Sequence, residues 1–158
     1  MFRPMLRKKQ QLPEAECIQL LTEEKRGVLS LIGDDGYPYG LPMDHWYDPQ
    51  DGCLYFHCGK LGHKLDAIRS CPKASYCVYD SGTRLEGNWY LTFRSVIVFG
   101  TVEILEDFET AMEAVRKLSL KFTEDTSYIE EEIRQSAKNT LVFRLVPQHI
   151  SGKIVNEL

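Results

Sequence analysis

The sequence predicts a mainly β fold with helices, in the form of an antiparallel barrel that carries helices at its rim. Three observations support this prediction. Strand-like apolar runs recur along the chain, turn residues separate most of them at hairpin distances, and helix-like segments stand between some of the runs. With 158 residues and no internal repeat, the chain is expected to form a single domain, residues 1–158.

Turn chemistry predicts a hairpin early in the chain. Two strand-like runs, residues 27–33 and 37–47, flank an Asp-Gly pair at 35–36, which is a strong hairpin signal. Pro38 and Pro42 have no amide hydrogen to donate to a ladder. The second strand is therefore expected at a sheet edge, bulged, or paired on one side only.

The other elements follow from apolar spacing and from helix start and stop signals. We expect helices at 13–25, 62–71 and from Asp107 to about 122, a weaker helix opened by Ser127 with Glu130 as a capping box, and strands at 53–58, 73–80, 89–105 and 139–147. Gly100 is expected to mark a bend or bulge in the long strand. Residues 148–155 are expected to form a tail.

Composition and charge exclude some classes of function. A net charge of -4 gives no basic face for nucleic acid, and no apolar run approaches the roughly 20 residues of a membrane span. The basic opening, residues 1–12, is expected to be a loosely packed tail, and it lacks the pattern of a signal peptide. Five cysteines without a CxxC pair favour reduced thiols in a cytoplasm.

The stretch "YFHCGKLGHKLD", residues 55–66, carries the most chemistry, and it permits two interpretations. A metal site would use its histidines and cysteine. However, His57 and Cys58 are adjacent, so on a strand they point to opposite faces, and no second close pair of ligands completes a zinc shell. The spacing therefore argues against a metal, and no metal ligand is assigned.

An anion site fits the same stretch better. A helix that begins near Gly62 leaves its first amides without intrahelical partners, and glycines at 59 and 62 let a ligand approach the backbone closely. His63 and Lys64 stand in the first turn, where a cation is unfavourable for the helix itself. We interpret Lys64 as a phosphate ligand, with a surface lysine as the alternative.

The strands beside this loop are expected to hold the rest of such a ligand. On the long strand, Ser95 places one hydroxyl on an otherwise apolar face, a pattern that can orient a flat apolar ligand, although a backbone hydrogen bond would also explain it. Backbone groups freed by a bulge around Met43 and Asp44 could meet a ligand edge.

With these residues in view, the chain resembles the pyridoxamine-phosphate-oxidase-like flavin-binding split barrels, and within them the nitroimidazole-resistance (Nim-type) branch. The resemblance rests on the order of "DDGYPYGLPMDHWYD", "LYFHCGKLGHKLDAIRSCP", "RSVIVFGTVEILED" and "ISGK", and it spans roughly residues 28–153. It implies an FMN-binding split barrel that forms a homodimer, with flavin at the subunit interface. The flavin is usually FMN, and FAD in some members.

The resemblance also implies roles for individual residues. The expected cofactor-binding residues are Met43, Asp44, His57, Cys58, Gly59, Gly62, His63, Lys64 and Ser95. His57 matches the histidine associated with the active site in the Nim-type branch, so it is the expected catalytic residue. Ser95 stands where the oxidases carry glutamine, and His63 where they usually carry arginine. Their C-terminal tryptophan and arginine signature is absent, so vitamin B6 oxidation is not expected.

Taken together, the expected function is a cytoplasmic flavin-dependent oxidoreductase that reduces a small acceptor such as a nitroaromatic or a quinone. Two alternatives stay open. One is a flavin-binding or sensing module without turnover. The other is a haem-binding protein of the same broad fold, with His57, His63 or His149 as axial ligand. The reductant and the acceptor are not legible in the sequence.

Overall fold

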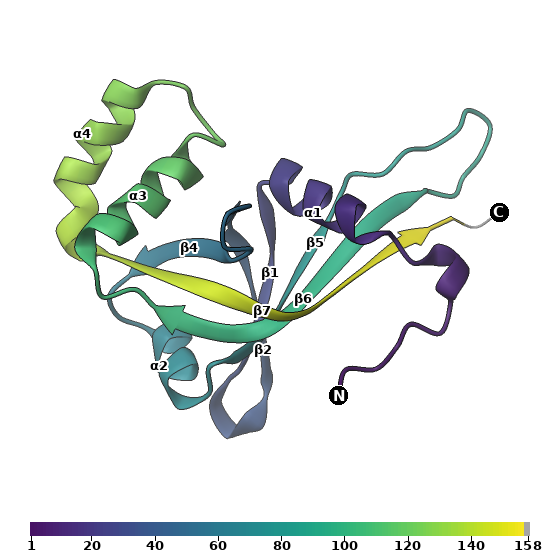
Figure 1. Cartoon of the computed structure of the whole chain (residues 1–158), viewed down its shortest axis with the longest axis horizontal. Coiled ribbons are helices and arrows are strands. Elements are labelled where there is room, and N and C mark those ends of the chain that lie inside the picture. Colours follow the sequence, from purple (N-terminus) through teal and green to yellow (C-terminus); the bar gives the residue numbers. More distant parts are fainter. Residues whose placement is uncertain (157–158) are drawn as a thin grey trace.

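The computed structural model describes residues 1–156 and contains seven strands and four α-helices within that range (Figure 1). In chain order they are α1 (Glu14–Glu23), β1 (Arg26–Ile32), β2 (Pro38–Asp44), β3 (Trp46–Tyr47), β4 (Leu54–Gly59), α2 (His63–Ser70), β5 (Lys73–Tyr79), β6 (Phe93–Ile104), α3 (Phe108–Ser119), α4 (Thr126–Ser136) and β7 (Thr140–Val155).

All seven strands belong to one antiparallel sheet in the order β2-β1-β5-β6-β7-β4-β3. Its two edge strands, β2 and β3, are consecutive in the chain and are separated only by His45. The sheet must therefore curl until its edges approach each other, which is the geometry of a split barrel. The predicted fold class is confirmed, and so is the edge position of the proline-containing strand β2.

Two apolar clusters hold the helices against this sheet. The larger one fills the inside of the curl, where α1 packs with side chains of β1, β4, β5, β6 and β7, among them Leu20, Leu29, Phe56, Tyr76 and Phe143. The smaller one lies on the outer face of β4 and β7, where α3 buries Ala111, Met112 and Ala114 against Tyr55 and Val142. As a result, β4 is covered on both faces.

The longest ladder joins β6 to β7 and contains a bulge. Its register shifts between Phe99 and Gly100, because Phe99 faces His149 while Gly100 faces Pro147. A Cβ on Gly100 would lie 2.1 Å from the carbonyl oxygen of Val146, so the two backbones approach too closely for any other residue. The bulge predicted at Gly100 is confirmed.

Two predictions about this ladder were wrong. Residues 148–155 are not a tail, since β7 continues to Val155 and pairs with the first half of β6. The strand predicted over 89–105 begins only at Phe93, and Trp89 lies outside it with 79% of its side chain exposed. Alternating sequence alone did not show which residues find a partner strand.

The helix ends follow capping chemistry with one difference from prediction. Asp107 caps α3 as expected, by accepting a hydrogen bond from the Thr110 amide at 2.8 Å. The predicted cap of α4 at Ser127 was wrong. Asp125 takes that role, because its carboxylate accepts from the Tyr128 amide at 3.0 Å.

The N-terminal segment makes specific contacts with the C-terminal half of β7. Leu12 is buried, its amide donates to the Gly152 carbonyl, and Gln11 forms a bridge with Lys153. Farther out, the Phe2 ring stacks on His149 with centroids 4.9 Å apart. Within the described residues, no helix has the length and apolarity needed to cross a membrane.

Candidate functional site

The junction between β4 and α2 forms an open cradle of backbone. Gly62 caps α2 with φ of 122°, a conformation that favours glycine, and its carbonyl accepts the Leu65 amide at 2.9 Å. The two amides before Leu65 have no intrahelical acceptor. A Cβ added to Gly59 or Gly62 would meet no atom within 4 Å, so the space beside both glycines is free for a ligand.

Lys64 supplies the cation of this cradle. Its side chain is half-buried, and its ammonium contacts the sulfur of Met43 at 3.3 Å. A thioether is a weak acceptor, and no carboxylate in residues 1–156 forms an ion pair with Lys64. An ammonium that is partly desolvated and lacks an anionic partner is suited to bind an anion from outside the chain.

His63 lies at the rim of the same cradle. Its ring stacks on Tyr39 with centroids 4.2 Å apart, and its Nε2 lies 3.6 Å from the Asp34 carboxylate. These contacts fix the ring beside the loop that joins β1 to β2. The sequence placed His63 beside Lys64 as a phosphate ligand, and the structure instead records its ring against Tyr39 and Asp34.

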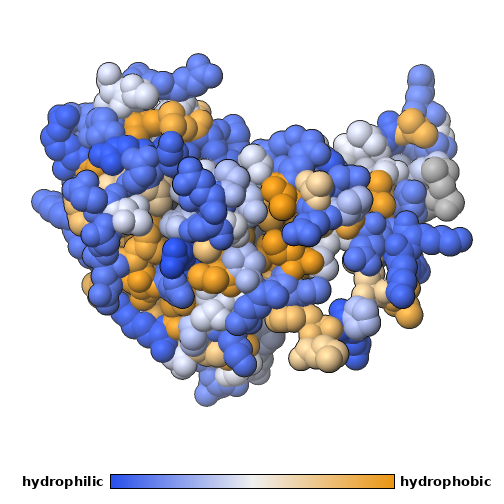
Figure 2. Space-filling view, viewed as in Figure 1, coloured by the Kyte–Doolittle hydropathy of each residue, from blue (hydrophilic) through white to orange (hydrophobic). Residues whose placement is uncertain are grey.

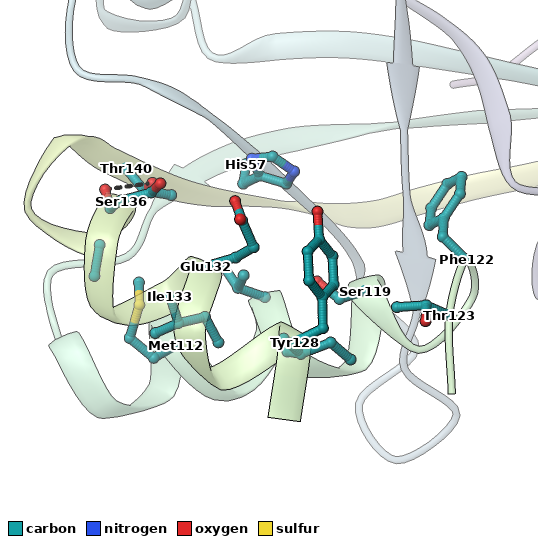
Figure 3. Close-up of a pocket in the computed structure, with 13 residues that line it drawn as sticks. His57, Met112, Ser119, Phe122, Thr123, Tyr128, Glu132, Ile133, Ser136 and Thr140 are labelled. Carbon is teal, nitrogen blue, oxygen red and sulfur yellow. Dashed lines mark hydrogen bonds between the residues drawn. The ribbon is translucent and has the colours of Figure 1, made fainter. Parts of the chain in front are cut away.

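His57 and Cys58 point to opposite faces of β4, as adjacent strand residues must. Cys58 packs against the inner apolar cluster, and burial raises the pKa of its thiol while Lys64 lowers it. His57 points outward into a pocket under α3 and α4 (Figure 3). Desolvation of the imidazole by protein atoms lowers the pKa of His57. The Asp44 carboxylate opposes this shift, and the Lys64 ammonium adds to it.

Met43 and Asp44 are already engaged within the chain. The Met43 carbonyl accepts a hydrogen bond from the Tyr76 hydroxyl at 2.6 Å. The Asp44 carboxylate binds both Nε and Nη2 of Arg26, at 2.6 and 3.1 Å. These contacts pin the end of β2 beside the cradle. They also occupy groups that the sequence left free for a ligand.

Ser95 is not brought next to Lys64 within one chain. It faces Tyr79 on β5 and Lys153 on β7, and extending the β1–β5 register by two residues places Arg26 in the same row. Asp44 faces Arg26, so Asp44 and Ser95 share a row and a sheet face. They are three strand spacings apart, about 14 Å.

Comparison with known proteins assigns this chain to a family. The sequence model described as pyridoxamine 5'-phosphate oxidase matches residues 13–154. The chain belongs to the pyridoxamine 5'-phosphate oxidase family. A search of curated proteins finds no significant match.

Solved structures related to this family share the fold at low identity. A candidate 5-nitroimidazole antibiotic resistance protein of Bacteroides thetaiotaomicron has a TM-score of 0.77 at 18% identity, over 91% of this chain and 86% of that one. An FAD-binding protein of Mesorhizobium loti has a TM-score of 0.65 at 24% identity, over 93% and 98%. An FAD- and haem-binding protein of Mycobacterium smegmatis has a TM-score of 0.76 at 20% identity, over 93% and 74%.

Sequence reasoning missed three side chains of this family member's site region. Arg26 holds Asp44, and Tyr128 and Glu132 line the pocket that contains His57. Tyr128 and Glu132 are four residues apart, so the sequence indicates that they share one face of a helix. No nearby residue pattern indicates that this face lies close to β4. In residues 1–156, no group of three or more His, Cys, Asp or Glu side chains is placed to hold a metal ion.

Proposed function

We propose that this member of the pyridoxamine 5'-phosphate oxidase family binds a flavin, FMN or FAD, with a phosphate at the cradle of Gly59, Gly62 and Lys64. The half-buried ammonium of Lys64, which has no carboxylate partner in the described residues, is the observation that carries the proposal. The helix N-terminus and the open space beside both glycines support the same assignment.

Two proteins that share this fold bind the ligand that we propose. The Mesorhizobium loti and Mycobacterium smegmatis proteins are FAD-binding, and the latter also binds haem. Because their identity to this chain is low, the proposal of a flavin for this chain rests on the geometry of the cradle of Gly59, Gly62 and Lys64. His63 would contribute to phosphate binding, and the Met43–Asp44 end of β2 would meet the flavin ring, held in place by Tyr76 and Arg26.

A second copy of the chain would complete the site. The outer face of β1, β5 and β6 exposes Val28, Tyr79, Ile97 and Phe99, which registered strand pairs place on one side of the sheet. Ser95 lies on this same face, away from Lys64 of its own chain. We therefore propose a homodimer across this face, in which Ser95 approaches the flavin held by the partner.

The reaction we propose is reduction of a small aromatic acceptor, such as a nitroaromatic or a quinone. A bound flavin would supply the redox chemistry. Within the chain, His57 is the candidate for holding a proton near the acceptor. Desolvation lowers its pKa, which favours the neutral ring, so the imidazole can accept a proton at its unprotonated nitrogen and pass that proton on from the protonated ring.

Replacing Lys64 tests the phosphate assignment. Lys64→Ala should weaken FMN binding by about tenfold to a hundredfold, because one charge-assisted contact to phosphate is lost. The measurement is a titration of flavin fluorescence with protein stripped of cofactor. Lys60→Ala is the matched control, since it removes an exposed lysine of the same loop. Equal affinity of K64A and the wild type would sink the assignment.

Anaerobic reduction separates an enzyme from a storage or sensing module. A turning-over flavoprotein should be reduced by NADH or NADPH and then reoxidised by menadione or a nitroimidazole within the same mixture. Bound flavin that neither nicotinamide reduces would favour the module. A Soret band in the purified protein would instead favour haem.

A further inference from the structure

A second candidate ligand site is the pocket between α3, α4 and the outer face of β4. Its volume is about 300 Å³, at the small end of ligand-binding cavities. Its walls are mainly apolar and come from both helices, with Met112, Val115, Phe122, Ile129 and Ile133 among them. A small molecule could bury most of its surface there.

Three polar side chains point into this space from different elements. His57 enters from β4, while Tyr128 and Glu132 rise from one face of α4, and their polar ends point toward one another (Figure 3). Among the thirteen residues drawn there, the only hydrogen bond made by a side chain runs from the Thr140 hydroxyl to the Ser136 carbonyl. The imidazole, the hydroxyl and the carboxylate therefore have no partner among these pocket-lining residues.

The charge of the pocket selects the kind of ligand. Glu132 carries the only formal charge among the lining side chains when His57 is neutral, and nearby protein atoms favour that neutral form. An apolar cavity with one carboxylate, one hydroxyl and one neutral imidazole suits a flat ring that presents a basic nitrogen or an N–H donor to Glu132. An anionic ligand would meet repulsion instead.

The surface around the pocket supports occupancy by a ring. The aromatic residues Phe122 and Tyr128 line the pocket and are 47% and 57% exposed. Figure 2 shows apolar side chains gathered beside α3 and α4 on an otherwise largely hydrophilic face. An aromatic ligand in the pocket can stack on Phe122 and Tyr128.

We propose that the α3–α4 pocket binds a one- or two-ring aromatic compound with a basic nitrogen, held by Glu132 and Tyr128 and in contact with His57. In the proposed function, His57 holds a proton near the electron acceptor. We identify this compound with that acceptor, and this part of the inference rests on the proposed function. The binding itself should need no flavin, because residues of this chain supply the imidazole, the hydroxyl and the carboxylate that would hold the compound. The two proposals can therefore fail separately.

Three probes of equal ring size test the proposal. 2-Naphthylmethylamine, 2-naphthylmethanol and 2-naphthoate are titrated into ¹⁵N-labelled protein stripped of flavin and, separately, into flavin-loaded protein, with amide shifts as the readout. The amine should bind about fivefold more tightly than the alcohol, the advantage of one partly exposed ion pair, and the naphthoate should bind weakest. The shifts should cluster on α3, α4 and His57.

Two variants locate the selectivity. Glu132→Gln should remove the preference for the amine, while Glu124→Gln, which removes one charge from the nearby loop outside the pocket, should leave it intact. Ser119→Phe should fill the cavity and weaken all three probes while the fold is retained, as judged by the rest of the spectrum.

The outcomes decide between this proposal and its rivals. Equal affinities for the three probes, tightest binding of naphthoate, or shifts remote from α4 would each overturn the pocket assignment. If the amine binds as expected but Lys64→Ala leaves flavin affinity unchanged, the pocket stands and the flavin assignment falls. If flavin binds as proposed and no probe reaches the pocket, only the pocket assignment falls.

Discussion

At the scale of single residues, the site depends on side chains that are absent as much as on those present. Gly59 has ordinary backbone angles and open space around its Cα, so nothing in the fold requires glycine there. Glycine loses more conformational entropy on folding than other residues, so at this position it lowers the stability of the fold without an evident structural need. A ligand that must approach the backbone gives the glycine a reason.

This leads to a prediction for Gly59. Gly59→Leu should unfold at a temperature within a few degrees of the wild type, because a Cβ at this position meets no atom within 4 Å. Flavin affinity should nevertheless fall at least about tenfold, since the new side chain occupies the space beside Lys64. Thermal denaturation and a flavin titration measure the two effects. A large loss of stability would show that the glycine serves the fold.

His45 is the one buried side chain of polar type in the described residues, and it links three elements. Its Nε2 must be protonated, because it donates to the Leu21 carbonyl at 2.7 Å. Its Nδ1 lies 2.9 Å from the oxygen of the Tyr76 hydroxyl, and that hydroxyl donates its one hydrogen to the Met43 carbonyl at 2.6 Å. The helix α1, the strand β5 and the end of β2 are therefore joined by one network of polar contacts.

Burial, reinforced by the charge of Lys121, lowers the pKa of His45 from 6.5 to about 4. The unfolded chain therefore binds this proton first, so stability is fully present above pH 6.5 and is lost as pH falls toward 4. The loss from this group should reach about 3 kcal/mol over that window. Urea unfolding at pH 7, 6 and 5 measures it.

A pair of variants isolates this effect. His45→Gln should be less stable than the wild type at pH 7 but should lose less stability between pH 7 and 5. His149→Gln, which alters an imidazole stacked beneath Phe2, should keep the wild-type slope. The same slope in all three proteins would mean that His45 is not the group that titrates.

At the scale of elements, the ladder of β6 and β7 decides how the barrel is built. The bulge at Gly100 lets β7 bend, so that residues 140–145 pair with β4 and residues 143–155 pair with β6. β7 therefore connects the half of the sheet that carries His57 with the half that carries Ser95. Capping and turn residues set where the shorter elements begin and end.

The close approach at Gly100 predicts a strong effect of one methyl group. Gly100→Ala should lower the free energy of unfolding by about 1–3 kcal/mol, because its Cβ would clash with the Val146 backbone. Gly40→Ala in β2 is the matched control, since its Cβ would meet Val28 at an ordinary 3.5 Å. Chemical denaturation compares them, and similar effects in both variants would contradict the role given to the bulge.

At the scale of the whole molecule, coverage of the sheet is uneven. Its inner face is filled by α1, and α3 covers the outer face of β4 and β7. The outer face over β1, β5 and β6 retains exposed apolar side chains, although Phe2 contacts the ring of Phe99 with centroids 5.5 Å apart. An uncovered apolar sheet face is suited to a second copy of the chain.

A charge at the centre of this face tests the proposed dimer. Ile97→Lys should convert the protein from dimer to monomer in sedimentation velocity experiments, because an unpaired ammonium would be buried between the sheets. It should also weaken flavin binding if the partner completes the site. Phe108→Lys, which places a lysine at an exposed position on α3, is the control. A wild-type protein that sediments as a monomer would refute the dimer outright.

The sequence by itself determined the element types, the hairpin at 35–36, the bulge at Gly100 and the glycine and lysine loop before α2. These features depend on turn chemistry, capping and periodicity, which act between residues close in the chain. The full length of β7 was not visible in this way, because a strand continues only where a partner strand lies beside it.

Only the tertiary structure decided which of these features meet. The curl of the sheet sets Lys64 against Met43, which lies 21 residues earlier, and leaves its ammonium without a carboxylate. The packing of α4 beside α3, which covers β4, brings Tyr128 and Glu132 to the pocket that His57 also lines, about 70 residues away along the chain. Contacts of this kind depend on how distant segments close on one another, and local sequence preferences carry little information about that.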